Sequence, residues 1–121
     1  MSGYTFYNAN PQGNNVTDCF IRSLSTATNR SWDSVYDEIS HLARINATTM
    51  DDKLFIISYL DRHFTRMPKF HGTIRDASHK YKNDILLITT PGHIVCSKYG
   101  TIYDTWDSSL KEVEYIWLIK S

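Results

Sequence analysis

The feature of the sequence that most constrains its fold is a change in the spacing of apolar residues near residue 83. Before this position, apolar side chains recur at the three- and four-residue intervals of amphipathic helices, whereas after it they alternate or form short β-branched runs typical of strands. Helices followed by strands predict an α+β fold in which N-terminal helices pack on one face of a C-terminal antiparallel β-sheet. A chain of 121 residues suits one domain, so we expect residues 1–121 to form a single unit.

The first predicted helix begins on a cysteine. Apolar residues recur at helical spacing from Cys19 onward, with Thr17 or Asp18 available as the N-cap. Asn29 or Arg30 marks the end of this helix. The thiol is therefore expected at a helix N-terminus.

Three further helices are expected before the change of period. A second helix follows the N-cap Ser31, a third spans about Asp51–His63, and a weaker pattern predicts a short helix around Ile74–Lys82. Residues 1–17 show no periodicity and are rich in turn-forming residues, so we expect them to form an extended or looped approach to the first helix.

Four strands with short connections are predicted in the last part of the chain. They cover Asp84–Thr90, His93–Lys98, Thr101–Asp104 and Val113–Ile119. Short connections favour antiparallel pairing of successive strands, which predicts an antiparallel meander.

The turn between the second and third strands determines which side chains share a face. If Tyr99-Gly100 is a two-residue hairpin loop, Lys98 pairs with Thr101. Tyrosine is a poor residue for the positive φ that such a turn requires, and a three-residue loop would instead turn Asp104 to the opposite face.

The two-residue register brings a histidine and a carboxylate together. His93 then falls opposite Trp106 and is the diagonal neighbour of Asp104, with their backbones about 7–8 Å apart. A carboxylate at this place can accept a hydrogen bond from the imidazole and fix its tautomer. Trp106 is expected in the core or as one wall of a cleft, and Cys96 points to the other face of the sheet and into packing.

These residues are the components of a nucleophilic site. The positive end of a helix dipole favours the thiolate of Cys19, while His93 would act as its general base and Asp104 would orient the imidazole. The negative charge of Asp18 beside Cys19 would raise the pKa of the thiol and disfavour the thiolate, unless Asp18 caps the helix or pairs with Arg22, four residues later.

An acyl-transfer site also needs donors for the oxyanion. The backbone N–H of Cys19 at the helix start is one candidate. Side-chain amides at Asn15, Asn14 and Gln12 precede the cysteine closely enough to supply the other, and we favour Asn15.

Two segments of the sequence carry a resemblance to a known family. They are Asn15-Val16-Thr17-Asp18-Cys19-Phe20-Ile21-Arg22 and Gly92-His93-Ile94-Val95-Cys96 with Asp104-Thr105-Trp106-Asp107. In having a cysteine at a helix start, then a histidine opening a strand, then an aspartate ending the next strand, the chain resembles the papain-like cysteine peptidase superfamily. It is similar to small phage and bacterial members and to the peptidase domains that remove double-glycine leader peptides.

The resemblance implies a papain-like fold and a thiol hydrolase that cleaves peptide or related amide bonds. By similarity, Cys19 would be the nucleophile, His93 the base and Asp104 the orienting residue. It covers roughly residues 14–28 and 84–119, and Gly13 stands where the family usually has a glutamine.

Composition limits the partners and the compartment. Thirteen basic and thirteen acidic residues cancel, so we expect no nucleic-acid partner, and the longest apolar run, Tyr115–Ile119, has only five residues, so we expect no membrane contact. The start lacks the pattern of a signal peptide, which predicts a cytoplasmic protein, in the host cytoplasm if it is phage-encoded. We expect a protein or peptide substrate, no cofactor and no metal, and the sequence leaves the oligomeric state open.

An alternative interpretation is a catalytically inactive papain-like binding module. Residues 61–82 hold six Lys or Arg and three His against two Asp. Such a basic surface is usually only solvated, but it would also suit a phage-encoded inhibitor that holds a host protein or a nucleotide-binding protein.

Overall fold

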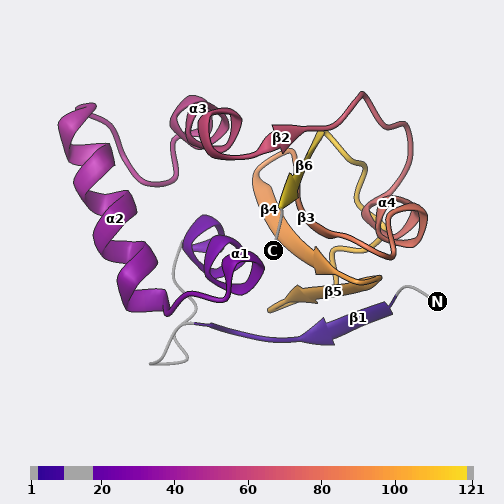
Figure 1. Ribbon diagram of the computed structural model, residues 1–121. Coiled ribbons are helices and arrows are strands. Elements are labelled where there is room, and N and C mark those ends of the chain that lie inside the picture. Colours follow the sequence, from indigo (N-terminus) through magenta and orange to yellow (C-terminus); the bar gives the residue numbers. More distant parts are fainter. Residues whose placement is uncertain (1–2, 10–17, 120–121) are drawn as a thin grey trace.

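The computed structural model describes residues 3–9 and 18–119. Within these ranges the chain forms an α+β fold of four helices and one six-stranded mixed sheet, with most of the helical residues in the N-terminal half (Figure 1). The α+β class is thus as expected from the change of period.

The helices agree closely with the predicted segments. They are α1 (Cys19–Thr28), α2 (Trp32–Ile45), α3 (Lys53–His63) and α4 (Ile74–Lys80). The predicted cap Ser31 accepts a hydrogen bond from the backbone N–H of Ser34. Asn29 ends α1 in the left-handed conformation, with φ of 57°.

The sheet contains the predicted strands and two more. Its members are β1 (Gly3–Phe6), β2 (Thr65–Arg66), β3 (Ile85–Thr90), β4 (His93–Lys98), β5 (Thr101–Asp104) and β6 (Tyr115–Ile119), in the order β1-β5-β4-β3-β6-β2. The meander is correct for β3, β4 and β5 but wrong for β6, which pairs with β3 on its other side. All six residues of β3 are buried, and pairing with β4 on one edge and β6 on the other satisfies the backbone N–H and C=O groups that burial removes from water.

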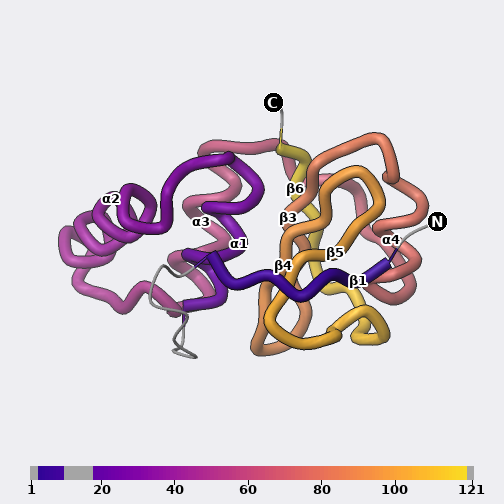
Figure 2. Tube along the Cα trace, turned by 90° about the horizontal axis from the view of Figure 1, so that it is seen from below, coloured from indigo at the N-terminus to yellow at the C-terminus, as the bar shows by residue number. Residues whose placement is uncertain are grey.

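The first described segment is a strand, so Gly3–Phe6 takes the extended of the two expected conformations, although its pairing in the sheet was not predicted. β1 lies parallel to β5, with Gly3 opposite Thr101 and Phe6 opposite Asp104. Figure 2 shows this segment running along β5 at the edge of the sheet. A four-residue strand with mostly exposed side chains has no alternating pattern that sequence analysis could detect.

Apolar side chains pack on both faces of the sheet. Residues of α1, α2 and α3 pack with Leu87, Ile94 and Cys96 on one face. Ile74 and Ala77 of α4 pack on the opposite face, away from α1 (Figure 1). The expectation that the helices share one face is therefore wrong, because β3 and β4 are apolar on both sides and each side must be covered.

The β4–β5 hairpin has the two-residue loop. Lys98 pairs with Thr101, and both Tyr99 and Gly100 have positive φ, 51° and 84°. These signs are those of a type I′ turn, which matches the twist of the flanking strands. Tyr99 is 60% exposed, so its strained conformation is not explained by burial of the ring.

In the described ranges, no helix combines the length and the hydropathy needed to cross a lipid bilayer.

The turn gives a first testable prediction. We expect Gly100→Ala to lower the free energy of unfolding by about 1–2 kcal/mol, because a Cβ is unfavourable at positive φ and would lie 3.3 Å from the Cβ of Lys82. Urea denaturation measures this change. The matched control is Gly3→Ala, where a Cβ meets nothing within 4 Å, and equal destabilisation by both changes would contradict the assigned turn.

Candidate active site

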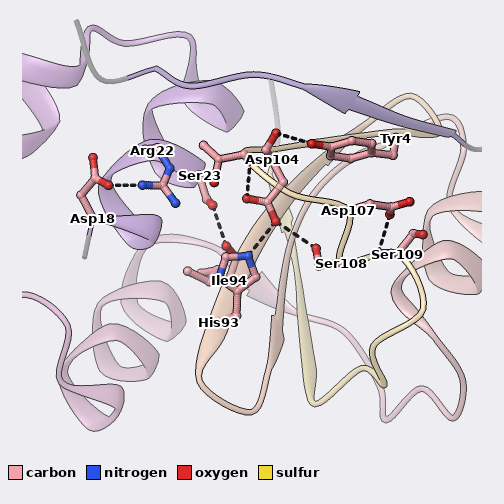
Figure 3. Close-up of polar contacts among 11 residues, drawn as sticks. Tyr4, Asp18, Arg22, Ser23, His93, Ile94, Asp104, Asp107, Ser108 and Ser109 are labelled. Atoms are coloured by element: carbon pink, nitrogen blue, oxygen red, sulfur yellow. Dashed lines mark hydrogen bonds and ion pairs between the residues drawn. The ribbon is translucent and has the colours of Figure 1, made fainter. Parts of the chain in front are cut away.

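A histidine and an aspartate meet at the end of the β4–β5 hairpin. His93 is the first residue of β4 and Asp104 the last residue of β5. Nε2 of His93 lies 2.6 Å from Oδ2 of Asp104 (Figure 3), and the two side chains are only 11% and 4% exposed. The predicted diagonal contact is present, because the two-residue turn keeps both side chains on one face.

The Asp104 carboxylate is held by three donors. Besides His93, the backbone N–H of Thr105 donates to Oδ1 at 2.7 Å, and the hydroxyl of Ser108 donates to Oδ2 at 2.9 Å. Sequence analysis did not identify Ser108. The only available signal is a serine four residues after the aspartate in a segment rich in turn-forming residues.

Strand β1 and the residue that follows it hold the backbone of the same aspartate. The carbonyl oxygen of Asp104 accepts hydrogen bonds from the hydroxyl of Tyr4 at 3.3 Å and from the backbone N–H of Tyr7 at 2.8 Å. The end of β5 is therefore fixed from both its side-chain and its main-chain groups.

Cys19 also acts on the imidazole. Its side chain is one of the two groups, with Asp104, that raise the pKa of His93. Cys19 is the first residue of α1, where backbone N–H groups lack partners within the helix. The described site thus has the order thiol, imidazole, carboxylate.

One buried hydrogen bond joins helix α1 to strand β4. The hydroxyl of Ser23, one helical turn after Cys19, donates to the carbonyl oxygen of Ile94 at 3.0 Å. Ile94 directly follows His93, so this contact ties the helix turn that begins with Cys19 to the strand that begins with His93 (Figure 3).

The carboxylate of Asp18, next to Cys19 in the sequence, interacts with Arg22 and Trp32. It forms an ion pair with Arg22, and its Oδ2 accepts a hydrogen bond from Nε1 of Trp32 at 2.8 Å. Asp18 stands at the N-cap position but its side chain makes no capping hydrogen bond. Asp18 was expected either to cap the helix or to pair with Arg22, and the structure has the pairing with Arg22.

The imidazole is polarised by its two neighbours. Burial lowers the pKa of His93, because the charged ring loses water. Hydrogen bonds to Asp104 and Cys19, together with the negative charge on these groups, outweigh burial and raise the pKa of His93 to about 9. A histidine of this kind holds its proton at neutral pH.

Trp106 covers one side of the imidazole. The two ring centroids are 4.8 Å apart, with the planes tilted by 33°, and the tryptophan is 43% exposed. The expectation of a core position for Trp106 is therefore wrong.

The other thiol takes no part in the site. Cys96 is fully buried among the apolar residues between the sheet and α1, and burial raises its pKa to about 12. In the described part of the chain, no group of three or more His, Cys, Asp or Glu is arranged to hold a metal ion. Asp107 accepts a hydrogen bond from the backbone N–H of Ser109 at 3.0 Å, as expected of a turn residue.

The proposed oxyanion donors cannot be compared with the structure. Asn15, Asn14 and Gln12 lie outside the described residues, as does Thr17.

Comparison with known proteins finds no match to a family model, to a curated protein or to a solved structure.

The raised pKa of His93 predicts how stability depends on pH. A folded-state pKa near 9, against about 6.5 unfolded, means that the protonated ring stabilises the fold fully below about pH 6.5. This contribution, on the order of 3 kcal/mol at 1.36 kcal/mol per pKa unit, is lost as the pH rises through 9. We expect Asp104→Asn to flatten this decline, as measured by urea unfolding between pH 6 and 9.

The matched control is Asp107→Asn, which removes an exposed carboxylate that bonds to Ser109. Hydrogen bonds to Ser109 lower the pKa of the Asp107 carboxyl, so Asp107 does not titrate between pH 6 and 9. A decline that is equally steep in Asp104→Asn and in the unaltered protein would contradict the pairing of His93 with Asp104.

Proposed function

We propose that the protein is a papain-like thiol hydrolase that cleaves a peptide or related amide bond through Cys19, His93 and Asp104. The observation that carries the proposal is the environment of His93, whose imidazole hydrogen bonds with Asp104 and whose raised pKa reflects both Asp104 and Cys19. A nucleophile, a base and an orienting group gathered at one place are the pattern of activated-nucleophile catalysis.

In the first step, the sulfur of Cys19 attacks the carbonyl carbon of the substrate amide and forms a tetrahedral intermediate. An imidazolium beside the sulfur stabilises its negative charge before attack. The backbone N–H of Cys19, at the start of α1, is one donor to the oxyanion, and we propose the amide of Asn15 as the second.

In the second step, the imidazolium of His93 gives its proton to the leaving nitrogen as the carbon–nitrogen bond breaks. This leaves a thioester on Cys19 and a neutral imidazole. His93 then takes a proton from a water molecule, whose oxygen attacks the thioester. The acid is released and the thiolate returns. Asp104 keeps the ring in one orientation through both proton transfers.

The resemblance to papain-like peptidases supports the same assignment. The family order of cysteine, histidine and aspartate along the chain coincides here with Cys19 at the start of α1, His93 at the start of β4 and Asp104 at the end of β5. A solvent-exposed Trp106 against the imidazole suits a cleft in which a substrate lies. We further propose a protein or peptide substrate in the cytoplasm, or in a host cytoplasm if the chain is phage-encoded.

One observation favours a second candidate, an inactive binding module with the same fold. All six basic residues of the segment 61–82 are exposed: Arg62, Arg66, Lys69, Arg75, Lys80 and Lys82. A basic surface of this kind suits an acidic protein partner. Binding through this surface does not require Cys19 to interact with His93. Activation of Cys19 by His93 therefore distinguishes the two candidates.

Thiol labelling tests whether Cys19 is activated. At pH 6–7 we expect iodoacetamide to alkylate Cys19 at least about tenfold faster in the unaltered protein than in His93→Ala. Peptide mass spectrometry gives the rate at Cys19. His79→Ala, which removes an exposed histidine of α4, is the matched control and should leave this rate unchanged. Equally slow labelling of Cys19 in the unaltered protein and in His93→Ala would favour the binding module.

Substrate profiling tests the reaction itself. We expect the protein to cleave members of a peptide library, and Cys19→Ala to lower the rate by more than about 1,000-fold because it removes the nucleophile. Chromatography with mass spectrometry identifies the bond that is broken. Cleavage that persists in Cys19→Ala would show that the activity belongs to another group or to a contaminant.

A further inference from the structure

We propose that Ser108 is a positioning residue that locks the Asp104 carboxylate toward His93. The proposal rests on the proposed function, because it assigns to Ser108 a part in the same site. It begins from one oxygen atom: Oδ2 of Asp104 accepts from Nε2 of His93 at 2.6 Å and also from the hydroxyl of Ser108 at 2.9 Å (Figure 3).

The carboxyl group needs such a restraint. The torsion about the bond to a carboxyl group is broad, without the sharp staggered minima of other side-chain torsions. The backbone N–H of Thr105 holds Oδ1 at 2.7 Å, but without Ser108 the one donor to Oδ2 among the described residues would be the imidazole that the carboxylate must orient. A second donor on Oδ2 fixes the plane of the carboxylate independently of the ring.

Water cannot easily replace the serine hydroxyl. Ser108 is 1% exposed and Asp104 is 5% exposed, so the hydrogen bond between them is closed to solvent. A buried acceptor that loses its donor cannot recover it from bulk water, which makes this contact more consequential than an exposed one.

The loop that carries Ser108 is itself fixed. The carbonyl oxygen of Ser108 accepts from the backbone N–H of Lys111 at 3.0 Å, and the backbone N–H of Ser109 donates to Asp107. The carbonyl oxygen of Ser109 accepts from the backbone N–H of Arg75, in the first turn of α4, at 2.8 Å. The far-face helix α4 thus supports the orienting aspartate through this loop.

The test compares two serines that are equally buried. Ser108→Ala removes the hydroxyl on Asp104, and Ser78→Ala removes a fully buried hydroxyl that contacts Ser97 at 2.7 Å, away from the site. Nuclear magnetic resonance follows the titration of the His93 ring, and iodoacetamide labelling follows Cys19 at pH 7. Ser108→Thr keeps the hydroxyl, and Ser108→Gly replaces the alanine variant if that variant does not fold.

We expect Ser108→Ala to lower the midpoint of the His93 titration by about 0.5–1 pH unit and to slow labelling of Cys19 roughly 3- to 10-fold, the range that one hydrogen bond supplies. Ser78→Ala should change neither value, and Ser108→Thr should restore both. An unchanged or raised midpoint in folded Ser108→Ala, or an equal change in Ser78→Ala, would overturn the positioning role.

The two proposals fail differently. Slow labelling of Cys19 in the unaltered protein would count against the hydrolase, whatever the Ser108 variants do. Fast labelling in the unaltered protein that persists unchanged in Ser108→Ala would leave the hydrolase standing and overturn only the role of Ser108.

Discussion

The hydrogen bond between His93 and Asp104 is the contact on which the candidate site depends, and it exists because of the turn that joins their strands. A two-residue loop with positive φ at Tyr99 and Gly100 sets the register of β4 and β5. Adding one residue to this loop would turn Asp104 to the other face of the sheet. The positive φ at Tyr99 is therefore part of the turn that places the side chains of His93 and Asp104 next to each other.

The rest of the fold brings the thiol to that pair. The fully buried strand β3 lets apolar residues pack on both faces of the sheet, so that α1 lies against β4 while α4 covers the opposite side. The bond from Ser23 to Ile94 then fixes the distance between the start of α1 and the start of β4. Helix and hairpin are separate in sequence, and this hydrogen bond adds a fixed point to their apolar packing.

Much of this arrangement follows from the sequence, since apolar periodicity is a local property. It predicted where the helix at Cys19 begins, and it predicted the face shared by His93 and Asp104. The features that periodicity did not predict depend on residues distant in the sequence. The strand Gly3–Phe6 has too little apolar pattern of its own and is defined by its pairing with β5. Ser108 is recognisable as part of the site only from its hydrogen bond to Asp104. The oxyanion donor, for which Asn15 is proposed, lies outside the described residues.

The most direct measurement is the titration of the His93 ring by nuclear magnetic resonance in the unaltered protein and in Cys19→Ala. If sulfur, imidazole and carboxylate form one linked group, the His93 ring titrates near pH 9 in the unaltered protein and at a distinctly lower pH in the variant, because one of the two side chains that raise its pKa is gone. Identical midpoints in the two proteins would mean that the thiol does not interact with the imidazole, which would contradict the account of the site.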